Sequence, residues 1–330
     1  MAIVYSLVVF LILGLMGYLG GSLPGLRVVF GVVVPYGAIL IFLAGVAIRI
    51  YQWASAPVPF RIPATGGQQK SLPWMKCSGI DNPSTGFGVF VRMVLEILFF
   101  RSLFRNTKAE LRDGPRLVFG ESKFLWLGAL AFHWSFLLIL LRHLRFFLEP
   151  VPGLVLAVEG VDGFLQVGTP VIYATDAVVL VALGYLLLRR VVDMRIRYLS
   201  LPADYFALFL LLGLSASGIL MRYWFKTDVV GVKQLALGLV TFQPILPEGV
   251  GAIFFVHLFL LSALIAYFPF SKLMHMGGVF LSPTRNLANN NRMKRHVNPW
   301  NPPVKVHSYQ EWEEEFRDKI VACGLPLEKE

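Results

Sequence analysis

The stretch FLWLGALAFHWSFLLILLRHLRFFL, residues Phe124 to Leu148, is mostly apolar over 25 residues, yet it contains two histidines, His133 and His143. A helix rising about 1.5 Å per residue needs roughly 20 apolar residues to cross the hydrocarbon core of a membrane. The stretch must be helical there, because an extended segment in lipid would leave its backbone N–H and C=O groups unpaired. An ionisable ring inside such a helix is costly, so both histidines are candidate functional residues.

Five further apolar runs of similar length predict an all-α integral membrane protein with six transmembrane helices. The composition, 56% hydrophobic and 15% charged, excludes a conventional water-soluble enzyme. The two cysteines, Cys77 and Cys323, exclude a disulfide scaffold, cannot alone hold a four-thiolate metal cluster, and have no role that the sequence identifies. The further runs are Ala2 to Leu19, Val28 to Ile50, Val171 to Leu188, Tyr205 to Tyr223 and Val250 to Phe270.

The basic residues predict how these helices are oriented. The chain has 30 Lys and Arg against 20 Asp and Glu, a net charge of +10. With six crossings, 24 of the basic residues fall on the side that also holds both termini. By the positive-inside rule that side is cytoplasmic, so we expect a multi-pass protein of the cytoplasmic (cell) membrane in contact with the lipid bilayer, and the charge requires no nucleic acid. The six basic residues of the outer side are Arg27, Arg142, Arg145, Arg222, Lys226 and Lys233.

Two more histidines, His257 and His275, lie in and just after the last run. They are 18 residues apart, which is five helical turns or about 27 Å, whereas His133 and His143 are ten residues or about 15 Å apart. No two histidines of one helix can therefore bind the same metal atom. Because the two helices are antiparallel, matching their levels pairs His133 with His275 near the cytoplasm and His143 with His257 near the outer face. Two histidines facing each other across a bundle are the axial ligands of a b-type haem.

Several residues around these histidines have more than one reading. Pro269 is expected to kink the last helix, because the unequal spacings of the two pairs do not fit two straight helices. Arg142 and Arg145 flank His143, and either pair with haem propionates or extend to the membrane interface. Glu159 and Asp162, in an outer segment too interrupted to be a span, are expected to be solvated.

The chain divides into four predicted parts. Residues 1–50 hold two N-terminal transmembrane helices, and residues 51–122 form a cytoplasmic loop in which Phe87 to Phe104 is an amphipathic helix at the interface. Residues 123–281 form a four-helix haem-binding membrane domain. Residues 282–330 form a polar cytoplasmic tail with a short helix, opened by a capping box from Ser308 to Glu311 and carrying an apolar stripe at Trp312, Phe316 and Ile320.

The two histidine spacings resemble those of the cytochrome b subunit of the respiratory nitrate reductase gamma family. The resemblance covers the last five runs, and the first run is an addition to the five-helix plan of that family. This added helix, the segment Lys76-Cys77-Ser78-Gly79 and the segment Ser282-Pro283-Thr284-Arg285-Asn286 are more similar to the branch found in sulfate reducers. That branch comprises the cytochrome b subunits (DsrM) of the DsrMKJOP complexes, also described as heterodisulfide-reductase-like menaquinol-oxidising complexes.

The resemblance implies two b-type haems, an inner one on His133 and His275 and an outer one on His143 and His257. It implies a non-autonomous subunit of a menaquinol oxidoreductase, linked to sulfate or sulfite respiration, which passes electrons from menaquinol at the outer side to a cytoplasmic iron–sulfur subunit related to heterodisulfide reductase. It also implies, as partners, an extracytoplasmic multihaem cytochrome c, an iron–sulfur subunit and a second membrane subunit. Asp176, an acid in the fourth run, either accepts a proton from the quinol or pairs with Arg142 or Arg145.

Two alternatives remain at the level of the sequence. The first is a transmembrane electron conduit with the same two haems and no quinone site of its own. The second is a six-helix transporter or assembly subunit with structural histidines, which is disfavoured because the matched levels of the histidines would then be a coincidence.

Overall fold

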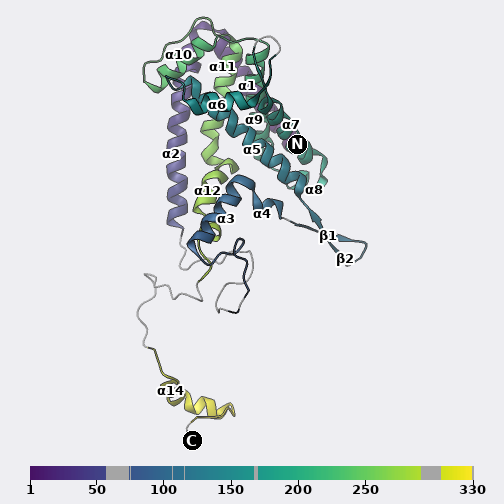
Figure 1. The fold of residues 1–330 in the computed structure, drawn as a ribbon, viewed down its shortest axis with the longest axis vertical. Helices are drawn as coiled ribbons and strands as arrows, with labels where there is room; N and C mark the ends of the chain where they lie inside the picture. The colour runs from purple at the N-terminus through teal and green to yellow at the C-terminus, as the bar shows by residue number, and fades with distance from the viewer. Residues whose placement is uncertain are drawn as a thin grey trace.

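The computed structural model is mostly helical, which agrees with the predicted all-α membrane protein (Figure 1). It describes residues 1–56, 74, 76–105, 107–114, 116–166, 170–290 and 306–328, with backbone only at 107–110 and 112. Several basic residues that contribute to the predicted cytoplasmic charge, such as Arg61 and Arg292, lie outside the described residues.

Among the described residues, five helices are long and apolar enough to cross a membrane, and each coincides with a predicted run. The sixth predicted span corresponds to α7 (Ala174–Val192), which packs against α5 and α9. It is 19 residues long but carries Asp176 in its first turn and two arginines in its last turn, so its crossing stays a prediction. The five helices are α1 (Ala2–Ser22), α2 (Val34–Ser55), α5 (Lys123–His143), α9 (Pro202–Tyr223) and α11 (Ala252–Tyr267).

The additional first helix is part of the bundle rather than an appendage. A Cβ atom on Gly17 would lie 2.9 Å from Val256 Cα, so α1 and α11 approach each other closely through glycine. Near the other end of α1, the Ser6 hydroxyl donates to the Pro202 carbonyl at the start of α9, at 2.7 Å. Helix α1 therefore supports the helix that carries His257.

Helix α11 does not continue as one rod to His275. It ends at Tyr267, and a 3-10 turn at Phe268–Phe270 contains Pro269, which has no N–H to donate. After an extended Ser271, a second 3-10 turn at Lys272–Met274 leads into α12 (His275–Leu281). The expected irregularity at Pro269 is confirmed as a full break in the helix.

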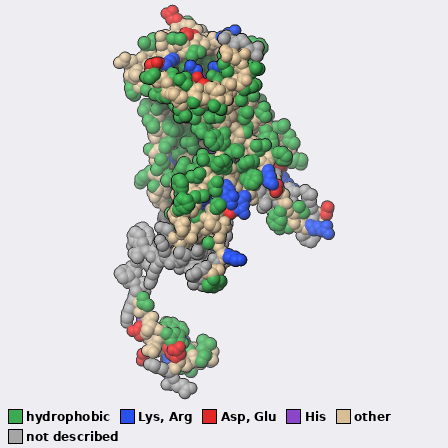
Figure 2. All heavy atoms as spheres, in the orientation of Figure 1, with side chains coloured by type: hydrophobic (Ala, Val, Ile, Leu, Met, Phe, Trp, Pro, Cys, Tyr) green, Lys and Arg blue, Asp and Glu red, His purple; other side chains and the backbone are tan. Residues whose placement is uncertain are grey.

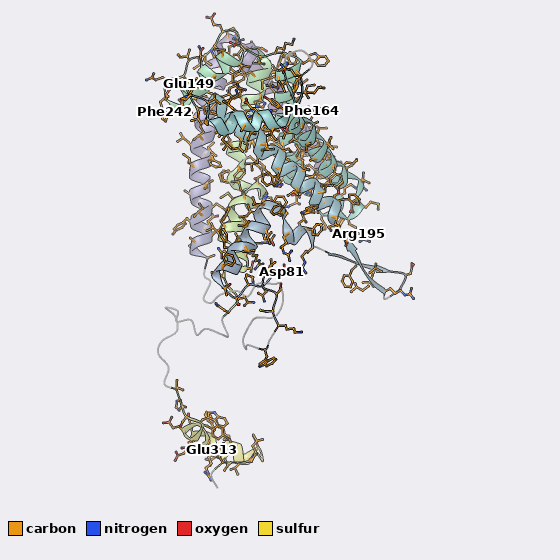
Figure 3. The ribbon with its side chains drawn as sticks, viewed as in Figure 1. Asp81, Glu149, Phe164, Arg195, Phe242 and Glu313 are labelled. Carbon is orange, nitrogen blue, oxygen red and sulfur yellow. The ribbon has the colours of Figure 1, made fainter. Side chains whose placement is uncertain are left out.

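Two helices too short to cross a membrane, α6 (Gly153–Asp162) and α10 (Val229–Val240), lie at the end of the bundle drawn uppermost in Figure 1. An antiparallel pair of short strands, β3 (Gly163–Leu165) and β4 (Ile172–Tyr173), connects α6 with α7. Glu149 and Phe242 are labelled at the same end in Figure 3. In this position α6 and α10 cover the ends of the longer helices.

The predicted interfacial helix is divided into α3 (Gly86–Phe99) and α4 (Arg101–Phe104) by Phe100, whose φ of 50° is left-handed. Its charged residues are not all in solvent, although Arg105 is exposed. Arg92 is buried and donates to the Thr284 carbonyl of α13 (Pro283–Asn286) at 3.1 Å. Helix α3 and the segment after α12 therefore fold together, and the Asn289 N–H, which donates to the Pro83 carbonyl at 2.8 Å, adds the loop before α3.

The structure adds a β-hairpin that the sequence analysis did not predict, β1 (Thr107–Arg112) paired with β2 (Arg116–Glu121). Asp113 and Gly114 of its turn both have positive φ, at 31° and 88°, and an Asp-Gly pair is a strong signal for such a turn. Two further helices are α8 (Met194–Leu199) and α14 (Tyr309–Ala322). The capping box predicted from Ser308 to Glu311 opens α14 and is confirmed.

The surface of the bundle is apolar where a membrane would surround it. Figure 2 shows hydrophobic side chains over most of the visible face, between charged groups at its two ends. Such a surface would be unfavourable in water and is expected in lipid. Exposed apolar residues on α1 and α2 include Val4, Leu11, Leu15, Leu40 and Leu43.

Candidate functional site

The helices that carry the predicted ligands, α5, α11 and α12, bring their histidines together in the predicted pairs. His143, the last residue of α5, faces His257 of α11 with 6.4 Å between ring centroids and an interplanar angle of 10°. His133 faces His275, the first residue of α12, with 5.9 Å between centroids and an angle of 85°. The antiparallel arrangement and the level matching are thus present in the structure, and the break at Pro269 places His275 opposite His133.

All four rings are held through the same nitrogen, Nδ1. In His133 it lies 2.7 Å from the Ala129 carbonyl, and in His143 it lies 2.7 Å from the Ile139 carbonyl. In His275 it lies 2.8 Å from the Lys272 carbonyl. Because a carbonyl can only accept, Nδ1 carries the proton in these three rings, and Nε2 is the nitrogen left to bind a metal. A ligating histidine whose other N–H is fixed in this way is typical of metal sites in proteins.

The spacing within each pair fits one metal ion held between two rings. A metal lies roughly 2.0 Å from a ligating imidazole nitrogen, and about 1.1 Å separates that nitrogen from its ring centre, so the centroids should be roughly 6.2 Å apart. The observed separations of 5.9 Å and 6.4 Å are close to that value. Two opposed neutral imidazoles are a donor set that suits a haem iron, whose other four ligands come from the porphyrin. The residues therefore fit the predicted cofactor.

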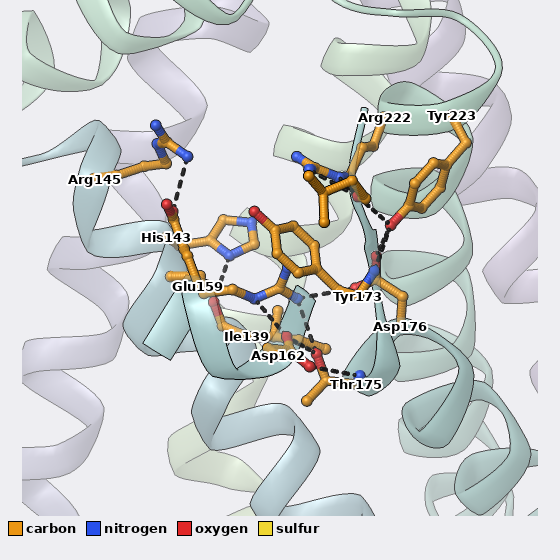
Figure 4. A network of polar contacts seen from close by, with 12 residues as sticks. Ile139, His143, Arg145, Glu159, Asp162, Tyr173, Thr175, Asp176, Arg222 and Tyr223 are labelled. Carbon is orange, nitrogen blue, oxygen red and sulfur yellow. Dashed lines mark hydrogen bonds and ion pairs between the residues drawn. The ribbon is translucent and has the colours of Figure 1, made fainter. Parts of the chain in front are cut away.

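Next to His143, a buried ion-pair network joins α5, α6 and α7 (Figure 4). Arg142 Nη2 lies 2.9 Å from Asp176 Oδ1, and Arg142 Nε lies 3.2 Å from Asp162 Oδ2. Thr175 donates to Asp162 from both its backbone N–H, at 2.9 Å, and its hydroxyl, at 2.6 Å. Asp162 is only 6% exposed, so the expectation that it is solvated was wrong. The antiparallel strands after α6 return the chain to α7 and place Asp162 against Thr175.

The other predicted arginine and acid of this region are also paired. Arg145 Nη1 lies 2.8 Å from Glu159 Oε1, whose side chain is only 14% exposed, so the solvated reading of Glu159 was wrong as well. Arg142 and Arg145 thus have carboxylate partners within the chain. Their contact with haem propionates stays a prediction.

Tyrosines complete the network on the side of α9. The Tyr173 ring lies between two guanidinium groups, with Arg142 Cζ 3.7 Å and Arg222 Cζ 4.2 Å from its centroid. The Tyr223 hydroxyl donates to Asp176 Oδ2 at 2.7 Å. Asp176 is therefore bound by both Arg142 and Tyr223, which favours the ion-pair alternative for this acid.

Two cavities adjoin these groups. The larger, of about 520 Å³, lies between α5, α6 and α7, with apolar walls that include Ala131, Leu138 and Val178 and with Asp162 and Thr175 at its polar edge. The smaller, of about 370 Å³, lies beside His275 and is lined by residues that include Arg49, Trp53 and Lys272. Each cavity thus combines apolar walls with a few charged groups.

The region around His133 and His275 connects to the folded segments before α3 and after α12. The Phe100 ring meets the His133 ring edge to face at 4.9 Å between centroids. Asn289 donates from its side chain to Asn82 at 2.6 Å, and Glu96 pairs with Arg285 at 3.2 Å. The His133 ring is thus covered by Phe100, between α3 and α4, whereas the His275 ring is exposed. Cys77 is half-buried and Cys323 exposed, and both are free thiols.

Comparison with known proteins agrees with this arrangement. The family model of the nitrate reductase gamma subunit matches residues 87–295. The Hdr-like menaquinol oxidoreductase cytochrome b-like subunit of Archaeoglobus fulgidus is 49% identical over 282 residues, covering 83% of this chain and 84% of that protein. The protein of the same description from Archaeoglobus profundus is 44% identical over 275 residues, covering 81% of each chain. The chain belongs to the nitrate reductase gamma subunit family and is similar, within it, to the cytochrome b-like subunits of Hdr-like menaquinol oxidoreductases.

Proposed function

We propose that this chain is the membrane-embedded di-haem cytochrome b subunit of a menaquinol oxidoreductase. The observation that carries the proposal is the presence of two opposed histidine pairs, His143 with His257 and His133 with His275, each at the separation that one bridging metal requires. The names of the relatives support a membrane cytochrome b in menaquinol oxidation. The number of haems, the substrate site and the partners are part of the proposal.

In this proposal His133 and His275 hold the iron of the inner haem, and His143 and His257 hold the iron of the outer haem. Bound haem supplies one-electron redox chemistry. The chain contributes the ligand orientation, since Nδ1 contacts with carbonyls fix the tautomer that leaves Nε2 unprotonated. Six crossings with both termini in the cytoplasm place the first pair near the cytoplasm and the second near the outer face.

Menaquinol is proposed to bind on the outer side, in the cavity between α5, α6 and α7. Its apolar wall of Ala131, Leu138 and Val178 suits a hydrophobic ring and tail, and Leu138 lies little more than one helical turn before His143. Oxidation of menaquinol to menaquinone releases two electrons and two protons. Two acids lie near this site: Asp162 is at the polar edge of the cavity, and Asp176 shares Arg142 with it. They are the groups proposed to receive the protons of the quinol. Asp176 pairs with Arg142, and Arg142 also pairs with Asp162 at the cavity edge, so as the proposed quinone-site acid Asp176 would act through this network and not by direct contact with the quinol.

Electrons are proposed to leave at the cytoplasmic end, to an iron–sulfur subunit related to heterodisulfide reductase. Beside the inner histidine pair lie Arg101 and Arg105, which both pair with Asp81, and Arg285, which pairs with Glu96, so three arginines face two acids there. The edge of this surface is Phe100, in contact with His133. A basic surface favours an acidic partner and speeds its association. In the complete complex we expect an extracytoplasmic multihaem cytochrome c, an iron–sulfur subunit and a second membrane subunit, and a role in sulfate or sulfite respiration.

The test is the haem content of the full chain purified in detergent, with its reduced-minus-oxidised spectrum. Two b-type haems per chain are expected, and replacing any one of His133, His143, His257 and His275 by Ala should remove or convert one haem. His307→Ala, in the polar tail, is the matched control and should retain both. A folded preparation without haem would overturn the proposal. Haems that dithionite reduces but a menaquinol analogue does not would favour the electron conduit over the quinol oxidase.

A further inference from the structure

One of the four histidines is held differently from the others. The Nδ1 atoms of His133, His143 and His275 each contact a main-chain carbonyl three or four residues earlier in the sequence. His257 Nδ1 instead lies 2.9 Å from the hydroxyl of Ser217, which belongs to another helix, α9. Among the four rings, only His257 thus has a side chain as a hydrogen-bond partner at Nδ1, beside the Leu214 carbonyl, and that side chain can be changed by mutation.

The direction of this hydrogen bond follows from the second contact of the hydroxyl. Ser217 Oγ also lies 3.0 Å from the Leu214 carbonyl, which can only accept. The hydroxyl proton is thus donated to Leu214, and a lone pair of the oxygen remains for His257. Nδ1–H of His257 donates to Ser217, and Nε2 is the unprotonated atom that faces His143.

The surroundings restrict the His257 ring further. Ser217 is 4% exposed, so water does not replace its hydroxyl readily. The neighbouring Gly218 has no side chain where a Cβ atom would lie only 3.2 Å from His257 Cε1. The ring is therefore placed by its hydrogen bond to Ser217, by the Leu214 carbonyl and by a close approach to α9, and it lies within 10° of parallel with the His143 ring.

We infer that Ser217 is a positioning residue that sets the orientation of His257 and, with it, the reduction potential of the outer haem. This inference rests on the proposed function. An acceptor at Nδ1–H makes the imidazole a more basic ligand, and a more basic ligand stabilises the ferric over the ferrous iron. Without the hydroxyl, the outer haem becomes easier to reduce, while the inner haem keeps its backbone-bonded ligands and its potential.

The experiment is a redox titration of the full chain carrying both haems, comparing wild type, Ser217→Ala and Ser217→Thr. In Ser217→Ala we expect a three- to tenfold shift of the reduced-to-oxidised equilibrium of one haem toward reduction, about 30 to 60 mV at 59 mV per tenfold for one electron. The EPR spectrum of the same haem should change, because the ring is no longer fixed. Ser217→Thr keeps a hydroxyl and should retain the wild-type potential and spectrum.

Ser262→Ala is the matched control. Ser262 lies on the same helix as His257, is 3% exposed, and donates to the Leu258 carbonyl at 2.8 Å. It should leave both potentials unchanged. Loss of the outer haem alone from a folded Ser217→Ala protein would also support the inference.

Three results would overturn it: unchanged potentials in Ser217→Ala, an equal shift of both haems, or an equal shift in Ser262→Ala. A wild-type chain that binds no haem contradicts the proposed function instead, so the two failures are distinguishable.

Discussion

The rings of His143 and His257 lie nearly parallel, with an interplanar angle of 10°, whereas those of His133 and His275 are close to perpendicular, at 85°. The two pairs thus differ in the property of axial ligands to which the EPR spectrum of a low-spin ferric haem is most sensitive. Parallel ligand planes give a rhombic spectrum, and perpendicular planes give a highly anisotropic one. The two proposed haems should therefore be distinguishable without knowledge of their potentials.

The first prediction is that the oxidised protein shows one signal of each kind. His143→Ala should remove the rhombic signal and retain the anisotropic one, because it removes one ligand of the parallel pair. His133→Ala should have the opposite effect. Two identical signals, or the loss of both in either variant, would contradict the assignment of the pairs.

A second prediction concerns Arg142, which pairs with Asp162 and Asp176 while its side chain is only 10% exposed. Arg142→Gln leaves two buried carboxylates without their cation, and breaking a buried pair in this way typically costs about 3 to 5 kcal/mol. A clear fall in the unfolding temperature in detergent is expected.

The control for that prediction is Arg145→Gln. Arg145 pairs with Glu159 but is 38% exposed, so solvent screens the pair and a loss of about 0 to 1 kcal/mol is expected. If the two variants unfold at the same temperature, the network around Arg142 does not join α5, α6 and α7 as the distances indicate.

A third prediction concerns the acid sensitivity of the segment before α3, where Asp81 lies (Figure 3). Burial alone would raise the pKa of Asp81, but hydrogen bonds from Arg105 and Ser78 and the charge of Arg101 outweigh it and lower the pKa below 3.8. A carboxyl with a lowered pKa stabilises the folded segment at pH values above its ordinary pKa, and this stabilisation is lost as the pH falls through the lowered value.

Pepsin cleavage within residues 76–105, followed between pH 2 and 5, measures this loss. Wild type should resist cleavage down to a pH below 3.8 and then become sensitive. Pepsin itself changes activity over this range, so each rate is divided by that of an unfolded reference substrate at the same pH. Asp81→Asn cannot ionise, so its normalised rate should be similar over the whole range. Equal profiles for the two proteins would show that Asp81 does not hold the segment.

The sequence was sufficient to predict the five long apolar helices and the pairing of the histidines, because both predictions depend on regular spacing. Long apolar runs specify membrane helices, and antiparallel helices with fixed rise specify which histidines lie level. The burial of Asp162 could not be predicted, since it depends on how α6 folds back against Thr175 of α7. Ser217 was missed for a similar reason, because nothing local to α9 indicates that it faces a residue 40 positions later. The β1–β2 hairpin, in contrast, has a local signal in the Asp113-Gly114 turn.

The fourth prediction tests the cavity of about 520 Å³ between α5, α6 and α7 as the menaquinol site. Ala131→Phe and Ala157→Phe each place a ring in its wall and should slow haem reduction by a menaquinol analogue at least tenfold, because the space for the quinol ring is filled. Reduction by dithionite, which needs no quinol site, should give the wild-type spectrum in both variants.

The control is Leu137→Phe, on α5. Its side chain is 44% exposed at the apolar surface, so the variant adds a similar ring outside the cavity and should retain the wild-type rate. If the two cavity variants are also reduced at the wild-type rate, the quinol binds elsewhere in the chain or on a partner subunit, and Asp162 and Asp176 are then structural acids only.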